Sequence, residues 1–329
     1  MRRILVKLRH TAMSVSIYRR NKMKIATIAL QMAAIAALAG CATAKRPGYD
    51  TLLAHRGESK DAPENTLPAY KLAVERGFGF ECDLYLSKDG RVFTFHDPDL
   101  KRTTGGTNAS KCADVTWKDT LSKLDVGSWG KWKGSQYAGT RPALLEDVLA
   151  LAQNGRRIYL EIKSGPEIVP VVKAILSSQD NATPDNVLFI SFNQSVCKAV
   201  KDILPEYTVY WLVGSHAGKG ESRRPVTVDE VIAGAREAAA DGVDMQFDPD
   251  VVDEAFVAAV KKEGLSFHVW TVDDLPHTLR AFAVGADTVT TNCAKDLLDE
   301  YVMLFAPEPD GRDEFSDRSV DGAAYPMMP

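Results

Sequence analysis

The sequence has few cysteines and no apolar stretch long enough to cross a lipid bilayer. Its 329 residues include five cysteines, and none of them is spaced like a pair of metal ligands. The apolar run at residues 25–39 is shorter than the roughly 20 residues of a membrane-spanning helix. A chain of this length can bury a large core without disulfides. We therefore expect buried free thiols at Cys82, Cys112, Cys197 and Cys293.

Acidic residues are missing from the first forty positions, which carry eight Lys or Arg. The apolar run follows this basic start and ends in small residues directly before Cys41. These features are typical of a secretory signal, and the cysteine makes it resemble a bacterial lipoprotein signal. We predict that residues 1–40 are removed and that Cys41 carries a lipid. Met23 is an alternative start of translation. The protein would then be exported to the periplasm or cell surface and anchored to a membrane; an ordinary signal peptide is the alternative.

Basic residues become scarce once this segment is removed. Of 40 Lys and Arg in the sequence, eight lie in the first forty positions, which leaves 32 against 44 Asp and Glu, a net charge of −12. Such a surface repels polyanions, so no nucleic acid is expected as a partner. The last residues, 307–329, lack apolar periodicity and are predicted to be a disordered tail. A linker at 41–50 and one folded domain at 51–306 remain.

Strand-like and helix-like patterns alternate through this domain. Short β-rich runs occupy residues 51–55, 78–85, 157–162, 187–191, 207–212, 243–247, 266–270 and 286–290. Helical patterns separate them, and Gly77, Gly155, Gly242 and Gly264 stand where helices usually end. A further short run at 92–96 follows a hairpin turn signal. The pattern predicts an α/β fold, a single (β/α)8 TIM barrel with a hairpin insertion after the second strand. An open doubly wound sheet is the alternative.

Alternation within the strands separates an apolar face from a polar one. Apolar residues suit helix packing outside the barrel, so the polar face points inward. The inward residues of four strands are Glu81 and Asp83, Glu161 and Lys163, Asp244 and Gln246, and His268 and Trp270. Buried carboxylates are costly unless they are paired or bind a metal. Glu81, Asp83 and Glu161 therefore predict one hard divalent cation, Mg²⁺ or Ca²⁺; an internal salt-bridge lattice is the alternative.

Two histidines occupy the ends of predicted strands. His55 ends the first strand and His96 ends the hairpin strand, positions from which a barrel delivers groups to its catalytic face. Flanking an acidic cluster, both suit general acid–base catalysis near neutral pH. His10, His216 and His277 are interpreted as structural. His268 faces inward and is expected to shape the pocket with Trp270.

Three segments together resemble a known family: AHRGESKDAPENT, GFGFECDLYLSKDGRVFTFHDPDLKRTTGG and YLEIKSG. They look like the pattern of the glycerophosphodiester phosphodiesterases, which are PLC-like phosphodiesterase TIM barrels. Later segments agree, namely ISFNQ, VWTVDD and GADTVTTN, so that the match covers about residues 52–296.

The resemblance implies a role for each matching residue. Glu81, Asp83 and Glu161 would bind the metal, and His55 and His96 would be the acid–base pair. The phosphate would be held by Arg56 and Lys163, and further substrate contacts are expected from Gln246 and Trp270. Asn65 or Thr66 is expected to cap the helix that begins near residue 67.

The activity implied is metal-dependent hydrolysis of glycerophosphodiesters to glycerol 3-phosphate and an alcohol. Attack by a neighbouring glycerol hydroxyl, through a cyclic phosphate, is what the family suggests; direct attack by water is the alternative. Other possibilities are cleavage of lysophospholipids, cleavage of glycerophosphate polymers, and a catalytically silent binding lipoprotein. Four aromatic residues in the loop 103–142 would either seat the head group or close the mouth: Trp117, Trp129, Trp132 and Tyr137.

Overall fold

The computed structural model describes residues 45–153 and 155–305. The predicted signal at 1–40, Cys41 and the predicted tail at 307–329 lie outside the described residues. Within the described part, no helix is both long and apolar enough to cross a membrane.

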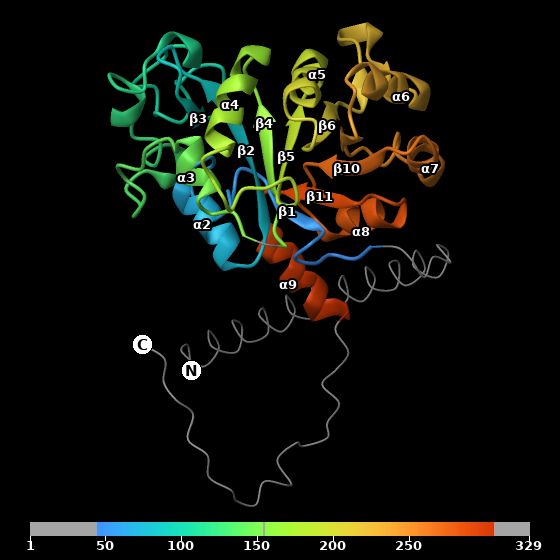
Figure 1. Cartoon of the computed structure of the whole chain (residues 1–329). Coiled ribbons are helices and arrows are strands. Elements are labelled where there is room, and N and C mark those ends of the chain that lie inside the picture. Colours follow the sequence, from blue (N-terminus) through green and yellow to red (C-terminus); the bar gives the residue numbers. More distant parts are fainter. Residues whose placement is uncertain (1–44, 154, 306–329) are drawn as a thin grey trace, which may run out of the picture.

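Eight parallel strands form a closed barrel (Figure 1). In chain order they are β1 (Leu52–Ala54), β2 (Gly79–Leu86), β4 (Ile158–Ile162), β5 (Val187–Ser191), β6 (Thr208–Val213), β9 (Gly242–Gln246), β10 (Ser266–Trp270) and β11 (Thr288–Thr291). Each strand pairs with the next, and β1 pairs with both β11 and β2, so the ring closes. The predicted barrel is confirmed, and the alternative prediction of an open doubly wound sheet is wrong.

Helices surround the barrel between successive strands and after the last one. They are α2 (Leu67–Glu75), α3 (Leu145–Leu149), α4 (Val169–Leu176), α5 (Gln194–Ile203), α6 (Val228–Glu237), α7 (Glu254–Lys262), α8 (Leu275–Ala283) and α9 (Ala294–Phe305). Local sequence fixes several of their starts, because the side chains of Asn193, Thr227, Asp253 and Asp274 accept hydrogen bonds from backbone N–H groups of the first turn.

Two apolar layers follow the alternation of the strands. The outer one packs strand residues such as Phe80, Cys82 and Leu160 against the helices. The inner one lies inside the barrel and consists of Leu53, Tyr159, Leu188, Ile190, Tyr210 and Leu212, with Trp270 beside it. The polar inward residues therefore share the barrel interior with a few large side chains. The four cysteines of the described domain are buried and free, as expected.

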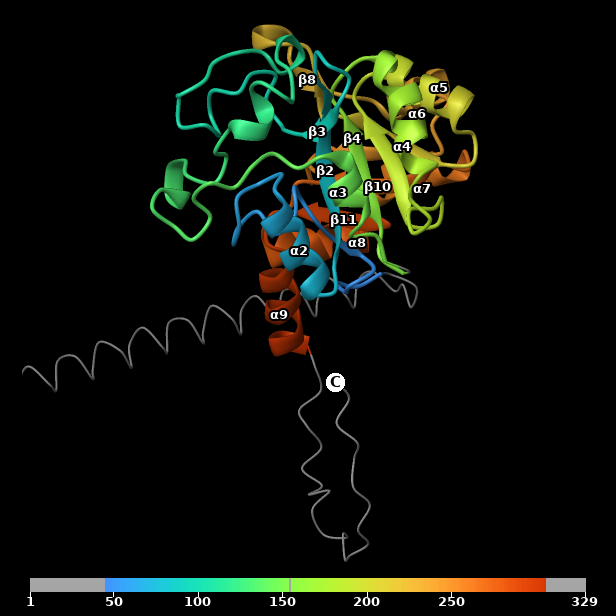
Figure 2. The same cartoon turned by 60° about the vertical axis from the view of Figure 1, so that its left-hand side comes forward.

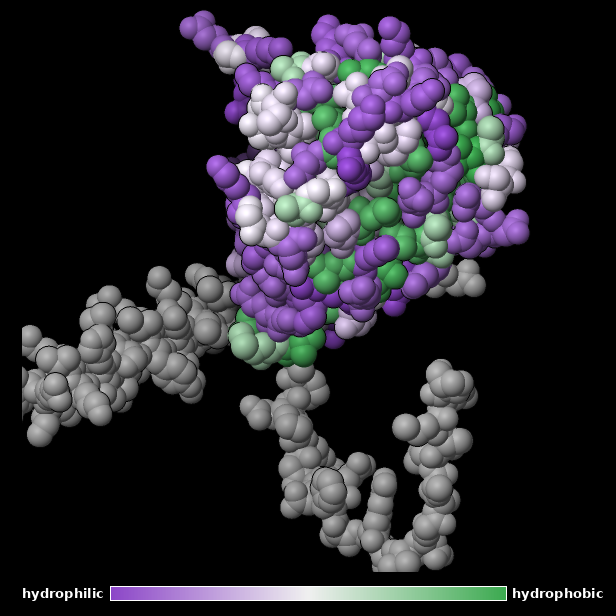
Figure 3. Space-filling view, turned by 90° about the vertical axis from the view of Figure 1, so that its left-hand side faces the viewer, coloured by the Kyte–Doolittle hydropathy of each residue, from purple (hydrophilic) through white to green (hydrophobic). Residues whose placement is uncertain are grey.

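An insertion follows β2 and extends beyond the barrel (Figure 2). Strand β3 (Val92–Thr94) pairs antiparallel with β2, and the chain then winds through three short 3₁₀ turns, Cys112–Asp114, Leu121–Lys123 and Gly130–Trp132. The insertion has a small core of its own that includes Phe93, Leu100 and Leu121. The side of the molecule that carries it shows hydrophobic residues between many hydrophilic ones (Figure 3). A second, two-residue hairpin joins β7 (His216–Ala217) to β8 (Arg224–Pro225).

Two of the four glycines that were predicted to end helices do not do so. Gly155 follows α3 only after six residues. Gly242 is the first residue of β9, where a Cβ atom would lie 2.1 Å from Ser266 Oγ, so the close approach of β10 requires glycine. After α6, Ala239 adopts the left-handed conformation instead, with φ of 53°. The sequence pattern could not separate a strand-packing glycine from a helix-ending one.

Candidate active site

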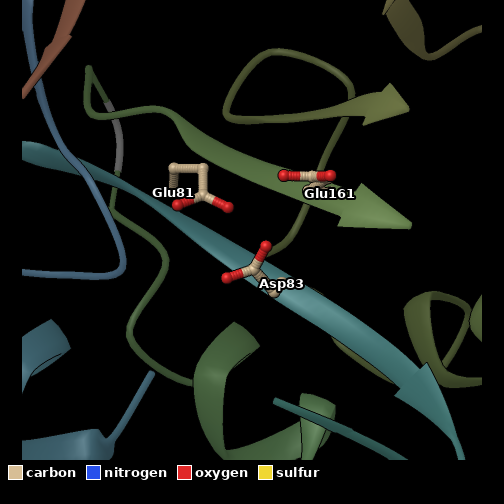
Figure 4. A group of neighbouring side chains, drawn as sticks. All are labelled: Glu81, Asp83 and Glu161. Atoms are coloured by element: carbon tan, nitrogen blue, oxygen red, sulfur yellow. The ribbon is translucent and has the colours of Figure 1, made fainter. Parts of the chain in front are cut away.

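Three carboxylates converge inside the barrel near the carboxyl ends of β2 and β4. Glu81, Asp83 and Glu161 are 2%, 0% and 7% exposed. Asp83 and Glu161 are direct partners in the β2–β4 ladder, which places their side chains on the same face. One oxygen of each carboxylate lies within 4.8 Å of the others, and Figure 4 shows the three groups turned toward one another. This arrangement of oxygen donors could hold a divalent cation.

Two cations contact this cluster. Lys163 Nζ lies 3.0 Å from Asp83 Oδ1 and 2.6 Å from Glu161 Oε1. Arg56 Nε lies 3.4 Å from Asp83 Oδ2, and the Arg56 backbone N–H donates to Glu81 Oε2 at 2.9 Å. Glu81 Oε1 is buried and has no hydrogen-bond partner among the residues that the structure describes. A buried carboxylate oxygen left without a partner is costly. The three carboxylates could therefore bind a metal ion in addition to the Lys163 ammonium and the Arg56 guanidinium.

The pKa values of the three carboxyls reflect this crowding. Burial raises the pKa of Glu81 well above its usual value, and Asp83 and Glu161 add to the rise. Burial, with the nearby Asp83 charge, raises the pKa of Glu161 to about 8. Burial also opposes ionisation of Asp83, but Lys163 and Arg56 outweigh it and hold the pKa of Asp83 below its usual range. The described residues thus supply too little positive charge for three ionised carboxylates.

The turn after β1 is built to bring Arg56 to the cluster. Arg56 has φ of 57°, and its guanidinium bonds Glu64 at 2.8 Å while it faces Asp83. Gly57 follows with φ of 77°, and a Cβ there would lie 2.6 Å from the backbone of Ala69 in α2. A left-handed turn packed this closely on a helix requires glycine.

Asn65 belongs to the site and not to a helix cap. Its Nδ2 donates to Asp83 Oδ2 at 2.6 Å, and its Oδ1 accepts from the Asp83 backbone N–H at 3.0 Å. Thr66 occupies the cap position of α2 but makes no side-chain cap bond, because its hydroxyl donates to Pro63 O. The predicted cap is therefore wrong, and Asn65 instead fixes the orientation of Asp83.

His55 is held by a chain of two polar residues. Its Nδ1 lies 2.8 Å from Asn292 Oδ1, while Asn292 Nδ2 donates to Asp273 Oδ2 at 2.7 Å. Because the amide nitrogen faces a carboxylate, the amide oxygen must face the ring, so His55 Nδ1 carries the proton. The other nitrogen, Nε2, lies 3.9 Å from Glu81 Oε2. Burial, with the charge of Arg56, lowers the pKa of His55 to about 4, which keeps the ring neutral.

His96 is held in a parallel way by a carboxylate. Its Nδ1 lies 2.7 Å from Asp97 Oδ1, and Asp97 Oδ2 accepts from Arg102 Nε at 2.7 Å. Arg102 also bonds Glu64 through two nitrogens at 2.8 and 2.7 Å, which links the network to Arg56. Because Asp97 occupies Nδ1 of His96, its Nε2 can contact a ligand, as in His55.

A cavity of about 220 Å³ unites these groups. Its lining contains most of the predicted residues: His55, Arg56, Glu81, His96, Glu161, Lys163 and Trp270. Gln246 is exposed and does not line this cavity; its Oε1 accepts from Ser215 Oγ at 3.4 Å. His268 lies deeper, stacked on Tyr210 with ring centroids 4.1 Å apart, and lines a cavity that also contains Lys45 and Asp287. The expectation that His268 shapes the pocket with Trp270 is wrong.

Comparison with known proteins identifies the family. The family model described as "Glycerophosphoryl diester phosphodiesterase family" matches residues 55–295. The chain belongs to this family. A glycerophosphodiester phosphodiesterase of Caldanaerobacter subterraneus is 31% identical over 251 residues, 75% of this chain and 96% of that protein. One from Bacillus subtilis is 30% identical, over 73% of this chain and 82% of that protein.

Solved structures of the family share this fold. An Oleispira antarctica phosphodiesterase in complex with the product sn-glycerol-3-phosphate is 26% identical, with a TM-score of 0.65 over 76% of this chain and 96% of that one. A structure from Silicibacter pomeroyi, titled putative glycerophosphoryl diester phosphodiesterase, has the same TM-score at 20% identity and covers 79% of this chain and 95% of that chain.

Several residues of the site were not predicted as such. Asn292 and Asp273 lie in the segments GADTVTTN and VWTVDD, which the family resemblance included without assigning roles. Asp97, directly after His96, is another. Asp244 was placed on the inward face but given no role, although it lines the cavity together with Thr290. A polar residue just beyond a strand end was the available signal for the first three.

The loop 103–142, with its four aromatic residues, lines part of a second cavity of about 470 Å³ beside the His55–Asn292 pair. Trp129 and Trp132 line it, together with Lys60, Lys131 and Asn292. Arg102 stands over the Trp129 ring at 5.0 Å, and Lys131 over the Trp132 ring at 4.4 Å, so each indole already has a cation of its own. Trp117 instead packs against the core of the insertion.

Proposed function

We propose that this protein hydrolyses glycerophosphodiesters to glycerol 3-phosphate and an alcohol, with one divalent cation and two catalytic histidines. The observation that carries the proposal is the cavity lined by Glu81, Glu161, two cations and two oriented histidines, with Asp83 completing the carboxylate cluster behind it. The names of the relatives support the substrate class. So does the product bound to the Oleispira phosphodiesterase, sn-glycerol-3-phosphate.

Glu81, Asp83 and Glu161 would hold the cation, which the oxygen donors indicate to be Mg²⁺ or Ca²⁺. When bound, the cation would neutralise negative charge on the nonbridging phosphate oxygens and fix the position of the phosphorus. Arg56 and Lys163, already beside the carboxylates, would add positive charge where the transition state gathers negative charge.

The histidines would move the protons. Neutral His55, with its proton held on Nδ1 by Asn292, has a lone pair on Nε2 that can accept the proton of an attacking hydroxyl. His96, backed by Asp97, can donate a proton from Nε2 to the departing alcohol oxygen. A hydroxyl of the substrate's own glycerol is the proposed nucleophile, and the cyclic phosphate so formed is opened by water with the proton roles reversed.

We further propose that the protein is exported and attached to the bacterial membrane through a lipid on Cys41. Lys45 Nζ bonds the backbone oxygen of Asp287, directly before β11 begins, so the described chain starts at the amino ends of the strands. Three residues separate Lys45 from Cys41, so the two positions can be at most roughly 14 Å apart. The catalytic cavity lies toward the opposite, carboxyl ends. This arrangement favours water-soluble glycerophosphodiesters over lysophospholipids held in the bilayer.

The test is product analysis with purified protein. Glycerophosphocholine should yield glycerol 3-phosphate and choline, a chelator should abolish the reaction, and Mg²⁺ or Ca²⁺ should restore it. A lysophospholipid presented in vesicles should be cleaved much more slowly. Release of phosphocholine in place of choline, or no turnover by folded and metal-loaded protein, would contradict the proposal; the second result would support a binding lipoprotein.

A further inference from the structure

We infer that Asp244 and Thr290 form the subsite that recognises the hydroxyl groups of the substrate's glycerol. The inference rests on the proposed function, since it assigns one wall of the same cavity. It concerns two residues that line the cavity. Among the described residues, their side chains make no hydrogen bond or ion pair to the carboxylates, cations or histidines described above, although Asp244 lies beside His268 in the β9–β10 ladder.

Both side chains are buried and lack a partner. Asp244 is 1% exposed and Thr290 is 2% exposed, and neither Asp244 Oδ1 nor Thr290 Oγ1 has a hydrogen-bond partner among the described residues. The contrast with Thr288 is direct. Thr288 lies on the same face of β11 two residues earlier, and its hydroxyl lies 2.7 Å from His268 Nδ1. Orphaned buried groups of this kind are rare and require an explanation such as a ligand.

The barrel places Asp244 across from the carboxylates and Thr290 beside β1, the strand that leads to His55. In the closed order of strands, β9 with Asp244 stands opposite β2 with Glu81 and Asp83. Strand β10 separates β9 from β11 and contributes Trp270 between Asp244 and Thr290. A phosphate held at the carboxylates would therefore direct the rest of a short substrate toward Asp244 and Thr290.

The chemistry of this wall suits a neutral diol. Burial alone raises the pKa of Asp244 to about 8, so its carboxyl is mostly protonated at pH 7 and can both donate and accept. The Thr290 hydroxyl has the same capacity. Trp270, Phe192, Leu212 and Ile190 line the rest of this side with apolar surface that fits the CH groups of a polyol. Among the described residues, no cation pairs with Asp244 or Thr290, whereas a diol finds two complementary groups there.

The test compares substrates with and without the diol. The variants are Asp244→Ala and Thr290→Val, with Thr288→Val as the matched control. The substrates are glycerophosphocholine, glycerophosphoglycerol and 2-hydroxypropylphosphocholine, which keeps the attacking hydroxyl but lacks the terminal one. We expect each of the first two variants to lower kcat/KM for both glycerophosphodiesters by about 10- to 100-fold. Turnover of 2-hydroxypropylphosphocholine should fall less, because this substrate lacks one of the two hydroxyls, and Thr288→Val should leave the ratio between substrates unchanged.

Three results would overturn the inference. Equal losses on all three substrates would indicate a structural role, and losses confined to glycerophosphocholine would indicate recognition of choline. Unchanged ratios with wild-type turnover would show that the diol binds elsewhere. Asp244→Asn keeps the shape and a donor and acceptor, so it should retain most of the discrimination; its loss would also count against the inference. Turnover of glycerophosphocholine by the wild type, measured alongside, separates each of these results from failure of the proposed function.

Discussion

Asn292→Ala should lower the turnover number because it releases the ring of His55. Within the described part of the chain, His55 Nδ1 has one hydrogen-bond acceptor, Asn292 Oδ1 at 2.8 Å, and Asp273 in turn holds this amide in place. Loss of a neutral hydrogen bond of about 0.5–1.5 kcal/mol would reduce the productive tautomer by roughly 2- to 12-fold. A ring free to shift by about 1 Å adds a penalty of up to ~10²-fold. We expect kcat to fall by about 10- to 100-fold.

The assay is steady-state hydrolysis of glycerophosphocholine, with metal content and thermal unfolding measured on the same sample. KM should change little, because Asn292 contacts neither Arg56 nor Lys163. Ser59→Ala is the control: Ser59 Oγ also donates to Asn292 Oδ1, at 3.1 Å, but Asp273 still orients the amide when this bond is lost. Its kcat should stay within about twofold of wild type. The reasoning is refuted if Asn292→Ala keeps wild-type kcat, or if KM rises while kcat is unchanged.

Three further predictions concern the histidines, the anchor and the buried acid. His55→Ala and His96→Ala should each lower kcat by roughly 10²–10⁴-fold in folded, metal-loaded protein, whereas His268→Ala should cost less because it lies deeper, beside Thr288; near wild-type turnover in either of the first two would refute the acid–base assignment. Cys41→Ser should shift the protein from the membrane fraction or leave an unprocessed precursor; mature protein with residues before position 41, seen by mass spectrometry, would exclude the anchor. Because the pKa of Asp244 is raised to about 8, its folded form keeps a proton that the unfolded chain releases, so stability should fall as pH rises from about 4 to 8; Asp244→Asn should remove this dependence and be more stable by about 1–3 kcal/mol above that window, measured by urea unfolding.

Alternation within strands made much of the barrel predictable. Glu81, Asp83 and Glu161 could be assigned to one inward face because a period of two, combined with parallel pairing, leaves little freedom. The alternation could not predict how deeply each residue along that face is buried. Asp244 and Gln246 share it, but one is buried and the other lies at the exposed rim, because the stagger of neighbouring strands sets the depth.

Hydrogen bonds between segments far apart in the sequence could not be predicted from the alternation of apolar and polar residues. His55 and Asn292 are 237 positions apart, and only closure of β1 onto β11 brings them together. Asn65 shows a different difficulty, since an asparagine just before a helix fits a cap equally well. Its bond to Asp83 depends on the left-handed backbone at Asn65, φ of 56°, which the sequence does not reveal.

The central claim is that the three carboxylates are the metal centre of a glycerophosphodiester phosphodiesterase. Its most direct test is isothermal titration of metal-free protein with Mg²⁺ and Ca²⁺, paired with glycerol 3-phosphate release at each metal concentration. We expect one bound cation per chain and activity that rises in proportion to occupancy of the site. Both should be lost in Glu81→Gln and Glu161→Gln variants that remain folded. Full activity without any bound cation, or unchanged binding in those variants, would contradict it.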